Sequence, residues 1–207
     1  MINRPLDAEQ ATDQTVFGGR PSAPLGRLMW PQCRWCQGAM QFLGQLRIDA
    51  DGDRDDDALL LLFMCRNRPG MCHQGEAESG GNAVLRVGLA DLQLVDPPPT
   101  GKTLRATRYA AAVTPIEQAL DYPSAAMGWA TATGTDTRQV LGQIGGTAHW
   151  EELDETPTCP ACGEAMRFTA LLEQGPDRKT EMNFGGGWAY VFRCGCAAKT
   201  ARLLLQC

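Results

Sequence analysis

One cysteine-containing pattern occurs twice in this sequence, and the repetition limits the folds that the chain can adopt. The first copy runs from residue 17 to 46 and the second from 144 to 172. Each copy has a pair of glycines, then a C-x-x-C, then Met-x-Phe, always in that order, and the offset from Cys33 to Cys159 is 126 residues. Because chance does not easily place these elements in one order twice, the sequence predicts an internally duplicated fold.

The residues that follow each C-x-x-C predict a β-hairpin. From 40 to 48, apolar and polar residues alternate, as in a strand with one buried face. A polar stretch with an Asp-Gly turn signal follows, and 58–65 is then continuously apolar, as in a fully buried strand. In the second copy, 166–173 and the alternating aromatic residues of 188–192 predict the same pair of strands. Such a hairpin returns a second cysteine pair beside the first, as in a zinc ribbon.

Eight of the nine cysteines fall into two groups of four, and Cys207 is left over. The two C-x-x-C turns let thiolates converge on one ion while backbone N–H groups soften their charge, so each group is predicted to bind a structural Zn²⁺. The chain would therefore hold one or two zinc ions. Ordinary buried cysteines and a redox C-x-x-C are the alternatives, although a redox pair would open a helix after a strand. The predicted ligands are Cys33, Cys36, Cys65 and Cys72 in the first group, and Cys159, Cys162, Cys194 and Cys196 in the second.

The composition of the sequence bears on the cellular location of the protein and on the kinds of partner that it binds. The amino-terminal residues are polar and acidic, without the apolar segment of a secretory signal, so a cytoplasmic location with reduced thiols is expected. No apolar run approaches the ~20 residues that span a bilayer, and no membrane association is expected. The net charge of −5 argues against a general nucleic-acid binder. No feature of the sequence sets an oligomeric state.

Three consecutive prolines after Asp96 divide the chain. The predicted segments are 1–96, the first pseudo-repeat; 97–143, a connector; and 144–207, the second pseudo-repeat. In the connector, the capping-box pattern with Pro115 at the first helical position predicts a short helix from Pro115 to about Asp121, which Tyr122-Pro123 would end. The expected fold class is α+β and β-rich, internally duplicated, with an antiparallel β-hairpin and a zinc-ribbon-like cysteine cluster in each half.

No catalytic constellation is recognisable. A closed site of four thiolates leaves no coordination position for water or substrate, so its zinc is expected to be structural. His149 and Glu151 before a C-x-x-C resemble part of a zinc-deaminase motif, but too few residues separate its two halves. The aspartates between 49 and 55 lack the glycine and glutamate of a calcium loop. The sequence therefore favours a protein that is not an enzyme.

The repeated words also resemble those of known families. Residues 17–87 and 140–206 carry F-G-G-x-P, W-P-x-C-x-x-C, M-x-F-L-x-Q-L, a strand ending in F-x-C-R-N, and a second C-P-x-C-G-x-x-M-x-F. These words resemble the YwqG-like family of uncharacterised bacterial proteins and the programmed-cell-death-2-like proteins of eukaryotes. The resemblance implies a duplicated β-rich fold with cysteine-bound zinc. It also implies a chaperone-like role, since the eukaryotic proteins are dedicated chaperones of a small-subunit ribosomal protein.

The expected function is that of a zinc-stabilised cytosolic protein-interaction module, chaperone-like toward a basic client protein. The candidate contact is 49–57, which holds six aspartates and one arginine, unless this stretch is an ordinary solvated turn. An alternative function is a nucleic-acid-binding zinc ribbon. A second alternative is a small-molecule enzyme, which would require an apolar pocket with converging polar groups. The basic aromatic face required by the nucleic-acid alternative would comprise Arg34, Trp35, Arg66 and Arg68.

Overall fold

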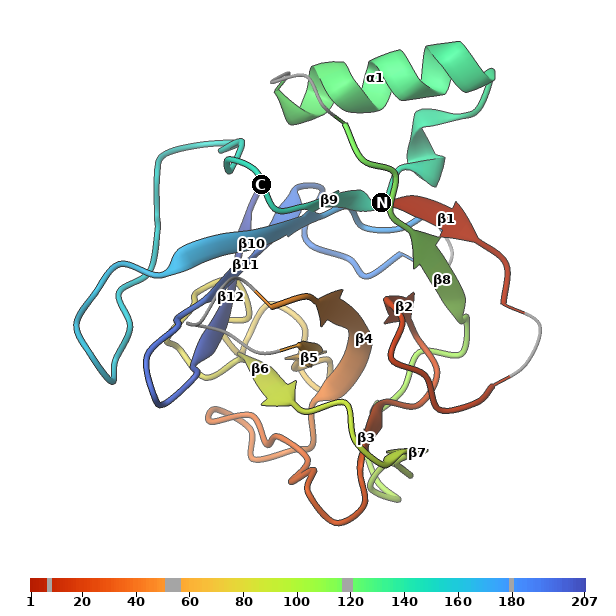
Figure 1. Cartoon of the computed structure of the whole chain (residues 1–207). Coiled ribbons are helices and arrows are strands. Elements are labelled where there is room, and N and C mark those ends of the chain that lie inside the picture. The colour runs from red at the N-terminus through yellow and green to blue at the C-terminus, as the bar shows by residue number, and fades with distance from the viewer. Residues whose placement is uncertain (7–8, 51–56, 117–120, 179–180) are drawn as a thin grey trace.

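The described part of the chain forms two antiparallel β-sheets and a short two-stranded ribbon, with one α-helix beside them (Figure 1). The computed structural model describes residues 1–6, 9–50, 57–116, 121–178 and 181–207. The larger sheet contains, in spatial order, β1 (Ile2–Arg4), β8 (Tyr109–Ala112), β2 (Val16–Phe17), β4 (Gln41–Ile48), β5 (Ala58–Met64) and β6 (Asn82–Val87). The smaller sheet contains β12 (Ala201–Gln206), β11 (Trp188–Arg193), β10 (Arg167–Leu172) and β9 (Gly142–Ile144), and the ribbon pairs β3 (Ser22–Pro24) with β7 (Leu92–Leu94). The β-rich fold with antiparallel sheets is thus as the sequence predicted.

Apolar side chains form three layers, one between the two sheets and one on the outer face of each. Alternation along β5 sends Leu60 and Leu62 to the core that both sheets share, and Leu59 and Leu61 to the outer face. In β11, Val191 faces the shared core while its neighbours face outward. The outer layer of the larger sheet contains all four cysteines of the first group, and that of the smaller sheet contains Cys159, Cys194 and Cys196 of the second. The outer layers therefore combine a small apolar cluster with a cysteine cluster.

A β-bulge occurs at the same place in β4 and in β10. The pairing shifts between Phe42 and Gly44 in β4 and between Phe168 and Ala170 in β10. The bulge changes the face to which alternate residues point, so the two phenylalanines belong to the outer layers while Ala170 belongs to the shared core. Each strand thereby supports a cysteine cluster with its first residues and the inter-sheet core with its last.

Strand β4 differs from the expectation of one exposed face. Gln45 is only 1% exposed, because other segments of the chain cover this side of the sheet. Its amide accepts a hydrogen bond from Ser22 N–H at 3.0 Å and donates to the carbonyl oxygens of Thr12 and Gln14 at 2.8 and 3.0 Å. The buried polar side chain is satisfied by backbone groups, which explains why the core tolerates it.

The helix lies later in the chain than predicted. Val113 to Ile116 are not helical, the following 117–120 lie outside the described residues, and α1 runs from Tyr122 to Thr133. Asp121, the predicted end, is instead the N-cap, and its carboxylate accepts from Ser124 N–H at 2.9 Å. Proline is tolerated in the first helical turn, where its missing N–H has no partner to lose, so Tyr122-Pro123 begins a helix.

A 3₁₀ turn, η2 (Thr137–Gln139), follows the helix. Within the described parts of the chain, no helix has the length and apolar character that crossing a membrane requires.

Candidate metal centres

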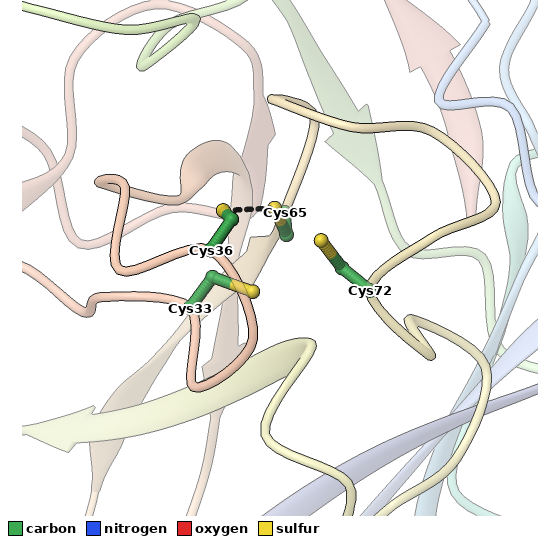
Figure 2. Close-up of side chains that lie close together, drawn as sticks. All are labelled: Cys33, Cys36, Cys65 and Cys72. Atoms are coloured by element: carbon green, nitrogen blue, oxygen red, sulfur yellow. Dashed lines mark hydrogen bonds between the residues drawn. The ribbon is translucent and has the colours of Figure 1, made fainter.

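The first cysteine group comes together at the end of the β4–β5 hairpin where β4 begins. Cys33 and Cys36 lie in a turn before β4, Cys65 follows β5, and Cys72 lies in the loop that leads to β6. Figure 2 shows the four side chains pointing toward one another, and their Sγ atoms all lie within 4.8 Å of one another. The Sγ atoms of Cys36 and Cys65 lie 3.6 Å apart. The sequence predicted this set of four.

The second group has the same arrangement in the smaller sheet. Cys159 and Cys162 lie in the turn before β10, Cys194 follows β11, and Cys196 lies in the turn before β12. All four Sγ atoms again lie within 4.8 Å of one another, with 3.6 Å from Cys162 to Cys194 and 3.8 Å from Cys159 to Cys196. The ninth cysteine, Cys207, is exposed and belongs to neither group.

The two C-x-x-C turns are held by matching backbone hydrogen bonds. In the first, Cys33 N–H donates to the Gly38 carbonyl at 2.9 Å, and Gln37 N–H donates to the Cys33 carbonyl at 2.8 Å. In the second, the corresponding distances are 2.8 Å, from Cys159 to Glu164, and 2.9 Å, from Gly163 to Cys159. Gln37 and Gly163 both have positive φ, at 57° and 79°. Each turn leads into a strand and not into a helix, which disfavours a redox pair.

Donors to sulfur surround both groups. Asn67 Nδ2 lies 3.7 Å from the Sγ atoms of both Cys36 and Cys65, and the Thr200 hydroxyl lies 3.0 Å from Cys159 Sγ. Cys196 N–H also points to Cys194 Sγ, at 3.5 Å. Hydrogen bonds of this kind stabilise thiolates that ligate a metal. Asn67 and Thr200 were not among the residues predicted from the sequence, although Asn67 belongs to the F-x-C-R-N word.

The thiols of each group differ in acidity. Burial raises the pKa of Cys36, but hydrogen bonds from Gly38 N–H and from neighbouring side chains outweigh it and bring the pKa to about 7. The Thr200 hydroxyl lowers the pKa of Cys159 to about 6. Burial raises the pKa of Cys72 to about 12. Four adjacent thiols cannot all lose their protons without a compensating cation, and a metal ion is such a cation.

The groups differ in exposure. In the first group, Cys33, Cys65 and Cys72 are buried and Cys36 is half-buried. In the second, Cys162 is exposed. Both sets offer four sulfur ligands, but solvent reaches the second more easily.

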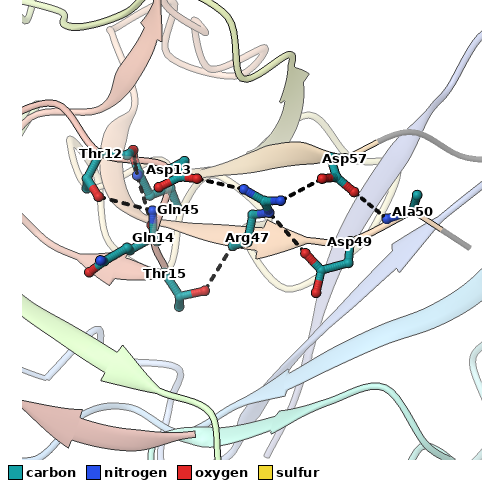
Figure 3. Close-up of polar contacts among 9 residues, drawn as sticks. All are labelled: Thr12, Asp13, Gln14, Thr15, Gln45, Arg47, Asp49, Ala50 and Asp57. Carbon is teal, nitrogen blue, oxygen red and sulfur yellow. Dashed lines mark hydrogen bonds and ion pairs between the residues drawn. The ribbon is translucent and has the colours of Figure 1, made fainter.

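The acidic stretch predicted to contact a basic partner lies at the opposite end of the β4–β5 hairpin. Residues 51–56 lie outside the described residues. Figure 3 shows the flanking carboxylates of Asp49 and Asp57, together with Asp13, gathered around Arg47. The three ion pairs measure 3.1, 2.7 and 2.7 Å respectively. Three carboxylates on one guanidinium leave this end of the hairpin negatively charged.

A pocket of about 630 Å³ lies beside α1, on the side of the smaller sheet. Its walls include Ile2, Tyr122, Trp129, Gly145 and His149. Tyr122 donates its hydroxyl proton to Glu173 Oε1 at 2.8 Å, and Asp121 is engaged at the helix N-cap. The pocket meets the size requirement of the small-molecule alternative, but neither cysteine group lines it.

No protein-family model matches this sequence, and no curated protein matches it significantly. The geometry of the cysteines therefore carries the assignment of the site. Each of the two groups of four can hold one metal ion.

Proposed function

We propose that the chain is a cytosolic zinc-stabilised module that binds two Zn²⁺ ions, one in each cysteine group. The carrying observation is the sulfur–sulfur spacing. Sulfurs held about 2.3 Å from a tetrahedral zinc lie about 3.8 Å from one another. Three sulfur pairs in the two groups measure 3.6, 3.6 and 3.8 Å, and all sulfurs of a group lie within 4.8 Å of one another. The soft thiolate donors favour zinc over hard cations such as Mg²⁺ or Ca²⁺.

Both sites are closed, and this supports a structural role for the metal. Four protein thiolates complete the tetrahedron, so neither water nor substrate has a coordination position. Each ion would tie the C-x-x-C turn before one strand to the segment after the next strand. Because the outer apolar layers are small, this cross-link would hold them on the sheets.

We further propose that the two halves arose by duplication of one zinc-ribbon-like hairpin. The support is the repeated offset of 126 residues, from Cys33 to Cys159, together with the matching turn hydrogen bonds and the matching bulges. The isolated bridges Gln32–Ala39 and Thr158–Ala165 close the two turns at the same offset. This relation also favours the YwqG-like and programmed-cell-death-2-like resemblance.

Metal analysis tests the zinc proposal. Elemental analysis of the purified full chain is expected to give two zinc ions per molecule. Cys36→Ser and Cys162→Ser should each reduce the content to one. Cys207→Ser is the matched control, because Cys207 lies outside both groups, and it should leave two. A chain without zinc, or a content that neither variant lowers, would overturn the proposal.

The biological role that we propose for this module is binding of a basic client protein. The support is the acidic end of the β4–β5 hairpin, where Asp13, Asp49 and Asp57 outnumber Arg47. Affinity purification at native expression levels should recover a basic partner with the wild type and not with Asp49→Asn/Asp57→Asn. Glu151→Gln/Glu152→Gln removes the same charge elsewhere on the surface and should retain the partner. Equal recovery by all three proteins would contradict this role.

A further inference from the structure

The turn that carries the first two cysteines presents an exposed tryptophan in a fixed orientation. Trp35 is 52% exposed, and its indole Nε1 donates to the Ser79 carbonyl at 2.9 Å. Its ring lies 4.4 Å from the ring of His73, with an angle of 31° between the planes. The hydrogen-bonding requirement of the indole is thus met within the chain. What the ring offers to a partner is its flat apolar surface.

The other tryptophans near the cysteine groups serve the outer layers instead. Trp30 packs edge-on against Phe63, with 5.3 Å between ring centroids, and Trp150 stacks on Tyr190 at 4.8 Å. Among the exposed large hydrophobic side chains of the described chain, Trp35 is the one aromatic residue. Packing of the protein's own core therefore does not account for its position.

Arginines flank this ring. Arg34 precedes Trp35 and is exposed, and its N–H donates to the Gly80 carbonyl at 3.0 Å. Arg68 is also exposed, in the loop that carries His73. Within the described residues, neither arginine forms an ion pair with a carboxylate. The predicted fourth member of the face, Arg66, is half-buried and donates to the Asn183 carbonyl at 3.4 Å.

We call Arg34, Trp35, Arg68 and His73 the knuckle surface, and we propose that it binds single-stranded nucleic acid. A base would stack on Trp35, and the two arginines would contact the flanking phosphates. Stacking on an aromatic ring requires a base that is free of its own helix, so a duplex fits this surface poorly. A polar chain with regularly spaced negative charges and flat apolar bases matches the surface better than an acidic peptide, which lacks the bases.

A carboxylate does contact the knuckle surface, since Glu76 Oε1 lies 3.2 Å from His73 Nδ1. The acidic cluster around Arg47, in contrast, is separated from this surface along the β4–β5 hairpin. The knuckle surface lies where β4 begins, and the acidic residues Asp49 and Asp57 lie where it ends. A strand of eight residues spans about 26 Å. That distance is about three Debye lengths at physiological salt, so the acidic end is largely screened from a ligand on the knuckle surface. The net charge of the chain therefore does not describe the local charge at either end of the β4–β5 hairpin.

Fluorescence anisotropy with the zinc-loaded full chain tests the proposal. The probes are a labelled 12-nucleotide single-stranded RNA of mixed sequence, the DNA of the same sequence, and its duplex. We expect saturable binding of the single strands and much weaker binding of the duplex. Trp35→Ala should weaken the binding of the single strands by roughly 5- to 150-fold, and Trp35→Phe should restore most of it. Zinc content measured for each variant shows whether the first cysteine group is intact.

Salt dependence isolates the arginines. Arg34→Gln/Arg68→Gln should lower the slope of log K against log salt by about 1.4, since each phosphate contact on a single strand contributes about 0.7. Arg178→Gln, which removes an exposed arginine elsewhere, should leave the slope unchanged.

Several results would overturn the proposal. One is the absence of saturable binding at low salt by a chain that holds both zinc ions. Another is equal affinity of Trp35→Ala and wild type, or of duplex and single strand. A polyglutamate peptide that binds as tightly as RNA and loses affinity in Trp35→Ala would assign the surface to an acidic protein instead.

Discussion

Gly81 is the residue at which the loop of the first cysteine group is most tightly constrained. A Cβ atom at this position would lie 2.0 Å from the Cys72 carbonyl oxygen, and Gly81 itself accepts the hydrogen bond of Cys65 N–H at 2.8 Å. Gly81→Ala must therefore displace one of two candidate ligands. We expect it to lower the zinc content toward one ion per chain and to cost about 1–3 kcal/mol of unfolding free energy.

The matched control for this substitution is Gly88→Ala. A Cβ atom at Gly88 would have no heavy atom within 4 Å. Zinc content and urea unfolding of both variants provide the measurement. If Gly81→Ala retained two ions and the wild-type midpoint, the close packing around Cys72 would not be required for the site.

Glu173 is a half-buried carboxyl group whose protonation depends on folding. Burial raises its pKa above the ordinary 4.5, although hydrogen bonds from Tyr122 and Trp188 oppose the shift. Because the folded state favours the protonated form, the stabilisation from this group is complete below about pH 4.5 and is lost as pH rises through the raised pKa. Glu173→Gln, which keeps a carbonyl oxygen for Tyr122, should therefore gain stability relative to wild type as pH rises from 5 to 8.

Urea unfolding at several pH values, with zinc present in the buffer, measures this difference. Glu78→Gln replaces an exposed carboxylate and should run parallel to wild type over the same range. A difference between Glu173→Gln and wild type that stays constant with pH would show that Glu173 keeps the same protonation state in both the folded and the unfolded chain.

At the scale of the elements, the two cysteine turns have the same backbone hydrogen bonds but differ in how far solvent reaches their cysteines. Cys162 is exposed, whereas three of the four cysteines in the first group are buried. A chelator reaches the second group without prior opening of the structure, while the first group must open locally. Zinc release to a colorimetric chelator should therefore show two phases, differing by more than about tenfold in rate, with the fast phase from the second group.

The single-site variants assign the phases. Cys162→Ser should remove the fast phase and Cys36→Ser the slow one, while Cys207→Ser should keep both. A single phase in wild type, with two ions released together, would mean that the groups open in one concerted step.

The elements that carry their own signal were predictable. The continuous apolar run that forms β5 and the alternating aromatics that form β11 match the strands that are observed. Strand β8, with the sequence Tyr-Ala-Ala-Ala, has little strand preference of its own and depends on pairing with β1 and β2, which are distant in sequence. The helix was misplaced because Pro123 suits a first turn as well as a break.

The candidate site, like the fold, could be predicted in part. All eight clustered cysteines were identified from their spacing, because the C-x-x-C turn and the hairpin register bring them together. Asn67 and Thr200 were missed because their contact with sulfur depends on the path of the loops after β5 and before β12. Local spacing determines which cysteines meet, whereas the donors around them are set by tertiary structure.

For the whole molecule, the layering separates the two cysteine groups. The first belongs to the outer layer of the larger sheet and the second to the outer layer of the smaller sheet, and the two layers share no buried residue. The core formed by both sheets lies between them, with Leu60, Leu62 and Val191 among its members. Removing a donor from one group should therefore leave the other group's contacts unchanged.

A double-mutant cycle tests this independence. Asn67→Ala removes contacts to the Cys36 and Cys65 sulfurs and a hydrogen bond to the Ala39 carbonyl, and should cost about 2 kcal/mol of unfolding free energy. Thr200→Val removes the contact to the Cys159 sulfur and should cost about 1 kcal/mol. For sites without shared contacts, the double variant should equal the sum within about 0.5 kcal/mol. Urea unfolding of the four proteins at fixed zinc concentration gives the coupling energy. A larger value would show that the inter-sheet core transmits changes between the groups, so that the two halves respond as one unit despite their separate outer layers.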